Sequence, residues 1–145
     1  MENAMTDILV AAPLAVIALI HGLWGLKIWW PIRAEPALAR AVVGARDIQT
    51  MPPPAPSFAV AFALLLAAFW ALALSGRISL AFAPDWLVSA GGISLAAIFL
   101  LRGLAGYTPF WARLCPEQPF RRLDRLIYSP LCLLLGLGFL VLLRQ

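Results

Sequence analysis

Four long apolar segments alternate along the chain with stretches that carry charge. No formally charged residue occurs between Asp7 and Lys27, between Asp47 and Arg77, between Asp85 and Arg102, or between Arg125 and Arg144. A helix needs about 20 mostly apolar residues to cross the hydrocarbon core of a bilayer. The pattern therefore predicts four membrane-spanning helices, near residues 8–30, 57–75, 86–106 and 126–143.

The composition agrees with this pattern. Of the 145 residues, 63% are hydrophobic and 12% are charged, whereas a soluble domain is roughly half apolar and about a quarter charged. The same values exclude a disordered chain. We predict a single integral membrane domain over residues 1–145, with an all-α fold that packs as a four-helix transmembrane bundle.

The first and third predicted helices contain similar segments. Residues 17–25 align with residues 98–106, and His21 then falls opposite Arg102. The second and fourth helices share a Leu-Leu-Leu run that ends in phenylalanine. Two parallel helical-hairpin repeats, related by an axis along the membrane normal, are one interpretation. Chance similarity between apolar helices is the other, and both stay open.

The basic residues are distributed unequally between the two ends of the predicted helices. Only Arg77 and Arg144 belong to one end, and the remaining nine belong to the two long loops and the adjoining helix ends. Cytoplasmic loops are enriched in Lys and Arg, so we expect both long loops in the cytoplasm and both termini outside. The nine residues are Lys27, Arg33, Arg40, Arg46, Arg102, Arg113, Arg121, Arg122 and Arg125.

The net charge and the few histidines and cysteines limit which molecules the chain is expected to bind. The formal net charge is +4, and because the basic residues flank the spans we predict no nucleic-acid binding. The single histidine and two cysteines form no CxxC or multi-histidine set, so we predict no metal site. The lipid bilayer is the expected partner. Other membrane subunits stay open as partners, and a cofactor stays undetermined.

The long loops carry further structural signals. Pro36 suits the first turn of a helix and Gly44 suits its end, which predicts a short surface helix near residues 35–44. Six aromatic residues near the ends of the spans are interpreted as interfacial anchors. They are Trp29, Trp30, Trp86, Tyr107, Trp111 and Tyr128.

Several polar residues lie inside or beside the predicted spans, where polar groups are costly and usually face the bundle interior, a cavity or a partner. His21 lies nine residues before the predicted helix end at Trp30, which is about 13 Å at the rise of an α-helix. We expect six residues to converge in a candidate polar pocket on the cytoplasmic side: His21, Arg102, Asp124, Tyr128, Ser129 and Cys132.

Each of these residues also has a structural interpretation. His21 can hydrogen-bond a neighbouring helix, and Arg102 can extend to the interface. Asp124 can pair with an arginine or begin the fourth helix. The segment Tyr128-Ser129-Pro130 can shape the helix entry, and Cys132 can serve as a small packing residue.

The chain resembles a bacterial family of small four-helix membrane proteins catalogued only as a domain of unknown function. The resemblance rests on His21-x-x-Trp24, Phe99-Leu100-x-Arg102-x-x-x-Gly106 and Leu123-Asp124-x-x-x-Tyr128-Ser129-Pro130-Leu131-Cys132. It implies a location in the bacterial inner membrane and gives more weight to His21, Arg102, Asp124, Tyr128 and Cys132. Trp24 of the same pattern also belongs to the candidate polar pocket. The chain departs from the family pattern at Tyr107-Thr108-Pro109, where an acidic-aromatic-basic stretch is expected.

Two classes of function follow. The first is a non-enzymatic accessory, assembly or ligand-binding component of a membrane complex, which suits the small size and the lack of a complete catalytic set. The second is a small membrane enzyme for a lipid or isoprenoid-like substrate, with His21 as acid/base and Arg102 holding an anionic group. The sequence does not decide between an enzyme and a binding protein, and it assigns no catalytic residue.

Overall fold

The computed structural model describes residues 3–81 and 83–144, and within these residues all regular structure is helical. Four helices are long and apolar enough to cross a membrane, so the predicted all-α transmembrane bundle is confirmed. The single-domain prediction also covers residues 1, 2, 82 and 145, which lie outside the described part. The long helices are α1 (Asn3–Gly25), α3 (Pro54–Leu74), α4 (Asp85–Ala105) and the combined span Phe120–Leu142.

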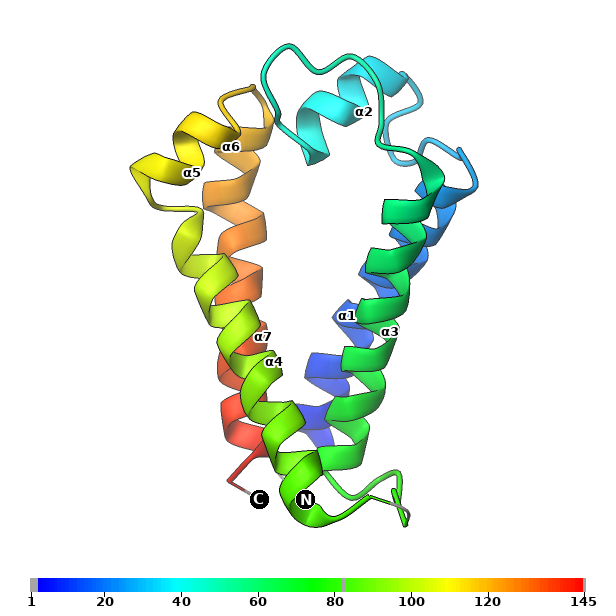
Figure 1. Cartoon of the computed structure of the whole chain (residues 1–145), viewed down its shortest axis with the longest axis vertical. Coiled ribbons are helices and arrows are strands. Elements are labelled where there is room, and N and C mark those ends of the chain that lie inside the picture. Colours follow the sequence, from blue (N-terminus) through cyan, green and yellow to red (C-terminus); the bar gives the residue numbers. More distant parts are fainter. Residues whose placement is uncertain (1–2, 82, 145) are drawn as a thin grey trace.

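The four spans are arranged as two helical hairpins (Figure 1). Helix α1 packs along α3, and α4 packs along α7 (Ser129–Leu142). The hairpins meet at the end that holds both termini, which we call the terminal end, and diverge towards the opposite end. The connections at that opposite end form the loop-end cap, residues 26–53 and 106–123. The cap contains α2 (Glu35–Val42), α5 (Pro109–Leu114) and α6 (Phe120–Leu123).

The hairpins pack together around small residues in the terminal half of the bundle. Leu14 and Phe139 are fully buried there, and Ala71 and Ala96 allow the helices to approach closely. Trp70 on α3 donates its indole N–H to the carbonyl of Val88 on α4 at 2.9 Å. Since lipid tails are as apolar as these side chains, close packing of small residues and hydrogen bonds between helices hold such a bundle together.

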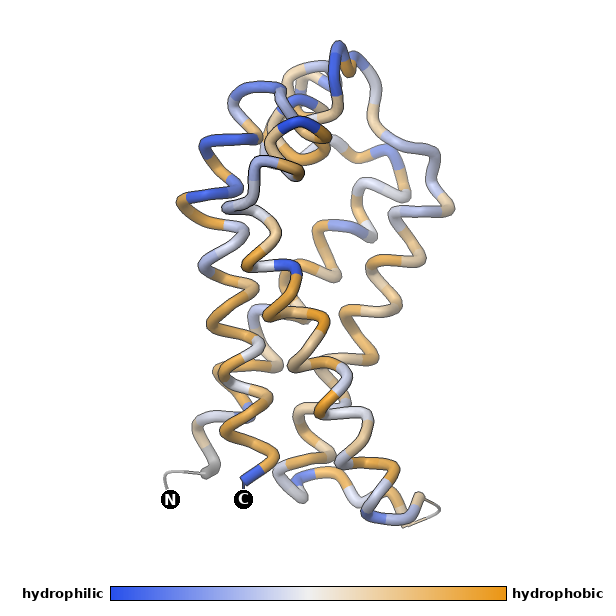
Figure 2. Tube along the Cα trace, turned by 60° about the vertical axis from the view of Figure 1, so that its left-hand side comes forward, coloured by the Kyte–Doolittle hydropathy of each residue, from blue (hydrophilic) through white to orange (hydrophobic). Residues whose placement is uncertain are grey.

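The outer surface of the spans is strongly apolar, as Figure 2 shows by the hydropathy along the chain. Leu19, Phe62 and Leu101 are each more than 65% exposed. Hydrophilic residues gather in the loop-end cap (Figure 2). A soluble protein would bury side chains of this size, so these faces contact the bilayer.

Helix α1 differs from the predicted span at both ends. It begins at Asn3 rather than residue 8, and it ends at Gly25 rather than Trp30. Lys27 adopts a left-handed φ of 60°, and the Ile28 N–H donates to the Leu23 carbonyl at 2.9 Å. This is a Schellman termination, which stops a helix whatever the hydropathy beyond it. His21 therefore lies four residues from the helix end, or about 6 Å, rather than the predicted nine residues.

The fourth span begins earlier than predicted, at Phe120 rather than residue 126. It consists of α6, a single π-turn η1 (Asp124–Tyr128) and α7. The charge of Asp124 does not end the helix, because this side chain is buried and paired. The widened turn ends two residues before Pro130, whose ring would crowd the Leu126 carbonyl in a regular α-helix.

Candidate functional site

A buried ion pair links α4 to the start of the fourth span. The Arg102 guanidinium donates from Nη2 to Oδ1 of Asp124 at 2.7 Å. The Asp124 side chain is 1% exposed and that of Arg102 is 30% exposed. Nη1 of Arg102 also lies 3.5 Å from Oγ of Ser129. Three residues of the predicted pocket are therefore in contact, and the cation and the carboxylate neutralise each other.

Gly106 allows these helices to approach closely at the ion pair. A Cβ atom on Gly106 would lie 1.8 Å from Oγ of Ser129 and 2.7 Å from Oδ2 of Asp124. The same Oδ2 atom is buried and has no hydrogen-bond partner within the described residues. It faces the α-carbon of Gly106, so the space beside it is filled by backbone.

Trp111 covers the other side of Arg102. The guanidinium carbon lies 4.6 Å from the centre of the Trp111 ring, which is a cation–π contact. Thr108 caps α5 by accepting a hydrogen bond from the Trp111 N–H at 3.2 Å. The sequence interpretation treated Trp111 only as an interfacial anchor and missed this contact, because the spacing does not specify the direction of α5.

The two cysteines lie near the same ion pair, and both are free thiols. Burial raises the pKa of the Cys115 thiol above its ordinary value, and the charge of Arg102 partly offsets this rise. Cys132 also interacts with the charges of Arg102 and Asp124. A raised pKa keeps Cys115 largely protonated at neutral pH, which disfavours a reactive thiolate.

Tyr128 faces the cap rather than the ion pair. Its hydroxyl donates to the carbonyl of Ala41 in α2 at 3.1 Å. The Phe120 ring packs against Tyr128 with centroids 5.8 Å apart and lies directly against Gly44. Gly44 has a φ of +71°, and its lack of a side chain admits the Phe120 ring. Tyr128 therefore joins the second hairpin to the connection of the first.

Glu117 makes a second link between the hairpins within the cap. Its backbone N–H donates to the Gly44 carbonyl at 3.2 Å, and its Oε1 accepts from the Asp47 N–H at 3.1 Å. A helix is present in the predicted range as α2, where Leu38 and Ala39 are fully buried. Its position at the membrane surface stays a prediction. These contacts make the cap a continuous structure that spans both hairpins.

His21 and Trp24 lie on the first hairpin and contact each other. Nδ1 of His21 is 2.9 Å from the carbonyl of Ile17, one turn earlier in the same helix. The rings of His21 and Trp24 are 4.7 Å apart at 54°, and the Trp24 indole donates to the Trp30 carbonyl at 2.8 Å. His21 and Trp24 make these contacts within the first hairpin. The two hairpins diverge at this end (Figure 1).

The structure thus divides the seven residues of the candidate polar pocket. Arg102, Asp124 and Ser129 form one centre with Cys132 nearby, Tyr128 serves the cap, and His21 and Trp24 form a separate pair. An apolar groove of about 660 Å³ between α1 and α3 is lined by side chains such as Leu19, Phe58 and Phe62. Within the described residues, no group of three or more His, Cys, Asp or Glu side chains is arranged so that it could hold a metal ion.

A second buried carboxylate lies at the terminal end, where the sequence predicted no site. Asp7 is 1% exposed and pairs with Nε of Arg77 at 2.5 Å. It also accepts from the Ser75 hydroxyl at 3.1 Å. The hydrogen bond to Asp7 raises the pKa of Arg77. The sequence contained a signal for this ion pair, because Asp7 and Arg77 flank the first and second predicted spans at the same end of the bundle.

The fold and these centres define a small multi-pass membrane protein whose two hairpins are joined by a polar cap. A search of curated proteins and a search of solved structures each find no match to this chain. Residues 14–139 match the family described as protein of unknown function (DUF3995). Because this match covers most of the chain, the protein belongs to that family.

Proposed function

We propose that this protein is a non-catalytic component of a membrane complex, and that its loop-end cap binds a partner subunit. The observation that carries the proposal is that candidate polar residues bind other parts of the same chain. Arg102 is paired with Asp124, and Tyr128 is bonded to Ala41. These residues hold the cap together, which leaves the outer face of the cap as the surface available for binding.

The outer face of the cap has the composition of a contact surface. Phe110 is 73% exposed, Leu114 is 55% exposed and Trp30 is 54% exposed. In the sequence, they belong to the same two long loops as most of the arginines of the loop end. Aromatic residues and arginine are enriched at protein–protein interfaces, whereas most other charged residues are depleted at their centres. This combination supports partner binding by the cap.

An enzyme that acts on a lipid or isoprenoid-like substrate is the alternative. It requires His21 and Arg102 to act on one bound molecule. The proposal of a binding component is better supported, because the polar contact of His21 is within α1 and the charge of Arg102 is already paired.

Crosslinking at matched phenylalanines tests the binding surface. A photoreactive phenylalanine analogue replaces Phe110 in the cap or Phe62 on the lipid-facing side of α3, which are 73% and 69% exposed. We expect a discrete protein adduct from position 110 and lipid adducts alone from position 62. Lipid adducts alone from both positions would contradict the proposed binding surface.

We also propose that the protein lies in the bacterial inner membrane with the cap in the cytoplasm. The excess of Lys and Arg at the loop end supports this orientation. In a Cys115→Ala/Cys132→Ala background, Ser79→Cys is expected to react with a membrane-impermeant maleimide in intact cells. Gln49→Cys is expected to react only after lysis. Both positions are exposed, and Ser79 avoids the Asp7–Arg77 pair. The reverse labelling would overturn the orientation.

A further inference from the structure

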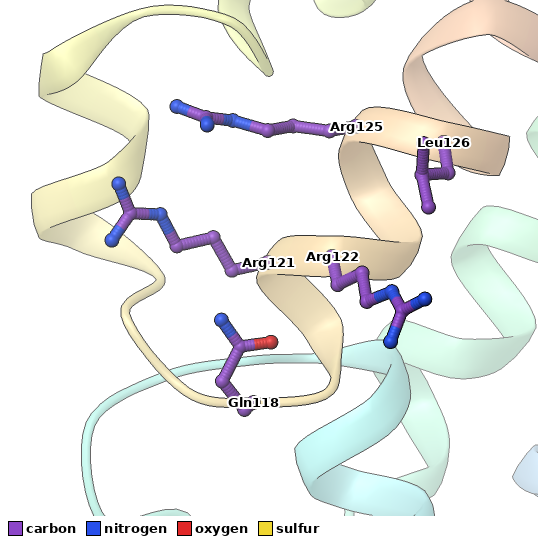
Figure 3. A pocket seen from close by; sticks show the side chains of 5 residues that line it. All are labelled: Gln118, Arg121, Arg122, Arg125 and Leu126. Carbon is purple, nitrogen blue, oxygen red and sulfur yellow. The ribbon is translucent and has the colours of Figure 1, made fainter.

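A hollow lies on the outer side of the cap, where the fourth span begins (Figure 3). Its volume is about 600 Å³. One side chain of its lining is apolar, one is an amide and three are guanidinium groups. They are Leu126, Gln118, Arg121, Arg122 and Arg125. Arg102, Asp124 and Phe110 are not among the residues that line it.

The hollow is strongly positive. All three arginines are exposed, and guanidinium groups stay protonated at any physiological pH. No carboxylate lines the hollow. The two nearest acids in the sequence are engaged elsewhere, because Asp124 pairs with Arg102 and Glu117 accepts from the Asp47 N–H. An anion in the hollow would relieve the repulsion among these arginines.

The backbone presents two of the arginines as a pair. Arg121 and Arg125 are four residues apart, and Figure 3 shows both side chains extending to the same side, towards α5. Arg122 extends in the opposite direction in this view. The Tyr107 hydroxyl donates to the Arg125 carbonyl at 3.0 Å, which fixes the turn that carries this side chain. Two guanidinium groups that line one hollow can both donate hydrogen bonds to the oxygens of a phosphate.

The position of the hollow favours a phosphate that is attached to a lipid. Leu126 is 64% exposed and Ile127 is 51% exposed, and the apolar α7 follows. A phospholipid bound here would place its phosphate at the arginines and its acyl chains along Leu126 and α7. Clusters of basic residues at the start of a span are a known means of recognising anionic headgroups.

We propose that Gln118, Arg121, Arg122, Arg125 and Leu126 form a binding site for a phosphate group, supplied by an anionic phospholipid. This inference does not depend on the proposed function, since it concerns a lipid ligand and is tested on the purified protein without a partner subunit. The proposed ligand is a component of the bilayer that surrounds the protein.

Binding to purified full-length protein in neutral detergent tests the site, with short-chain phosphatidylglycerol as the probe and native mass spectrometry as the readout. Arg121→Gln/Arg125→Gln is expected to weaken binding roughly tenfold or more. The matched control is Arg33→Gln/Arg40→Gln, which removes two exposed arginines elsewhere in the cap and is expected to leave binding unchanged. Arg121→Lys/Arg125→Lys keeps the charge and is expected to retain most of the binding.

Two further arms identify the source of the phosphate. Phosphatidylcholine, which has no net charge, is expected to bind weakly, and inorganic phosphate alone is expected to compete poorly. Binding of inorganic phosphate that is lost in Arg121→Gln/Arg125→Gln would support the phosphate site and assign it to a soluble ligand. Equal losses in the two double variants, or equal binding of the two lipids, would overturn the site. Equal thermal unfolding of all variants controls for misfolding.

Discussion

Replacement of Arg102 by leucine is expected to lower the free energy of unfolding by about 3 kcal/mol. The reason is that Asp124, which is 1% exposed, then keeps a buried charge without a cationic partner. Thermal unfolding in detergent micelles, followed by circular dichroism, measures the loss. Asp124→Leu is expected to cost less, because the Arg102 side chain is 30% exposed and can extend to the interface.

A double variant separates pairing from packing. Arg102→Leu/Asp124→Leu removes both charges and is expected to be more stable than Arg102→Leu alone, since an apolar replacement of a whole buried pair is often tolerated. Arg113→Leu changes an exposed arginine in α5 and is expected to have little effect. A loss for Arg102→Leu no greater than that for Arg113→Leu would contradict the central position of this pair.

The second large effect is expected at Gly106. Gly106→Ala would place a methyl group 1.8 Å from Oγ of Ser129 and 2.7 Å from Oδ2 of Asp124. Inserting a methyl group into a packed interior costs about 1–3 kcal/mol, and we expect the upper part of this range. The atoms that it meets hold the ion pair, so α4 must move away from the fourth span. The midpoint of thermal unfolding and the yield of folded protein both measure this effect.

Gly22→Ala is the matched control for Gly106→Ala. Gly22 lies inside α1, and a Cβ atom there would meet nothing within 4 Å. Alanine is a better helix former than glycine, so this change is expected to stabilise the protein slightly, by about 0.5–1 kcal/mol. The two variants are therefore expected to shift the unfolding midpoint in opposite directions. Shifts of the same sign and size would show that Gly106 is not a point of close approach.

The sequence predicted the four-helix fold because gaps between charges mark apolar segments long enough to span a bilayer. The same rule misplaced helix ends where a charge is buried. Asp7 and Asp124 both lie inside helices, paired with Arg77 and Arg102. The end of α1 depends on the left-handed backbone at Lys27, which hydropathy does not encode. The two-hairpin arrangement agrees with the repeat hypothesis but does not establish its origin.

The sequence grouped Arg102, Asp124 and Ser129, and the structure brings these three residues into contact. It also grouped His21 with them, on the basis of an overestimated distance from the helix end and a comparison between spans. The divergence of the two hairpins is a property of packing towards the terminal end, where Ala71 and Ala96 belong to one buried cluster. No local spacing in α1 carries that information, so the separation of His21 from Arg102 was not predictable.

Native mass spectrometry after gentle extraction from the native membrane tests the central claim, that the protein is a binding component held together by its polar residues. We expect a second polypeptide in fixed stoichiometry and bound phospholipid, with the polypeptide retained in His21→Ala. A bound small molecule that is not a phospholipid, present without a partner polypeptide and lost in His21→Ala, would contradict the claim and favour the enzyme.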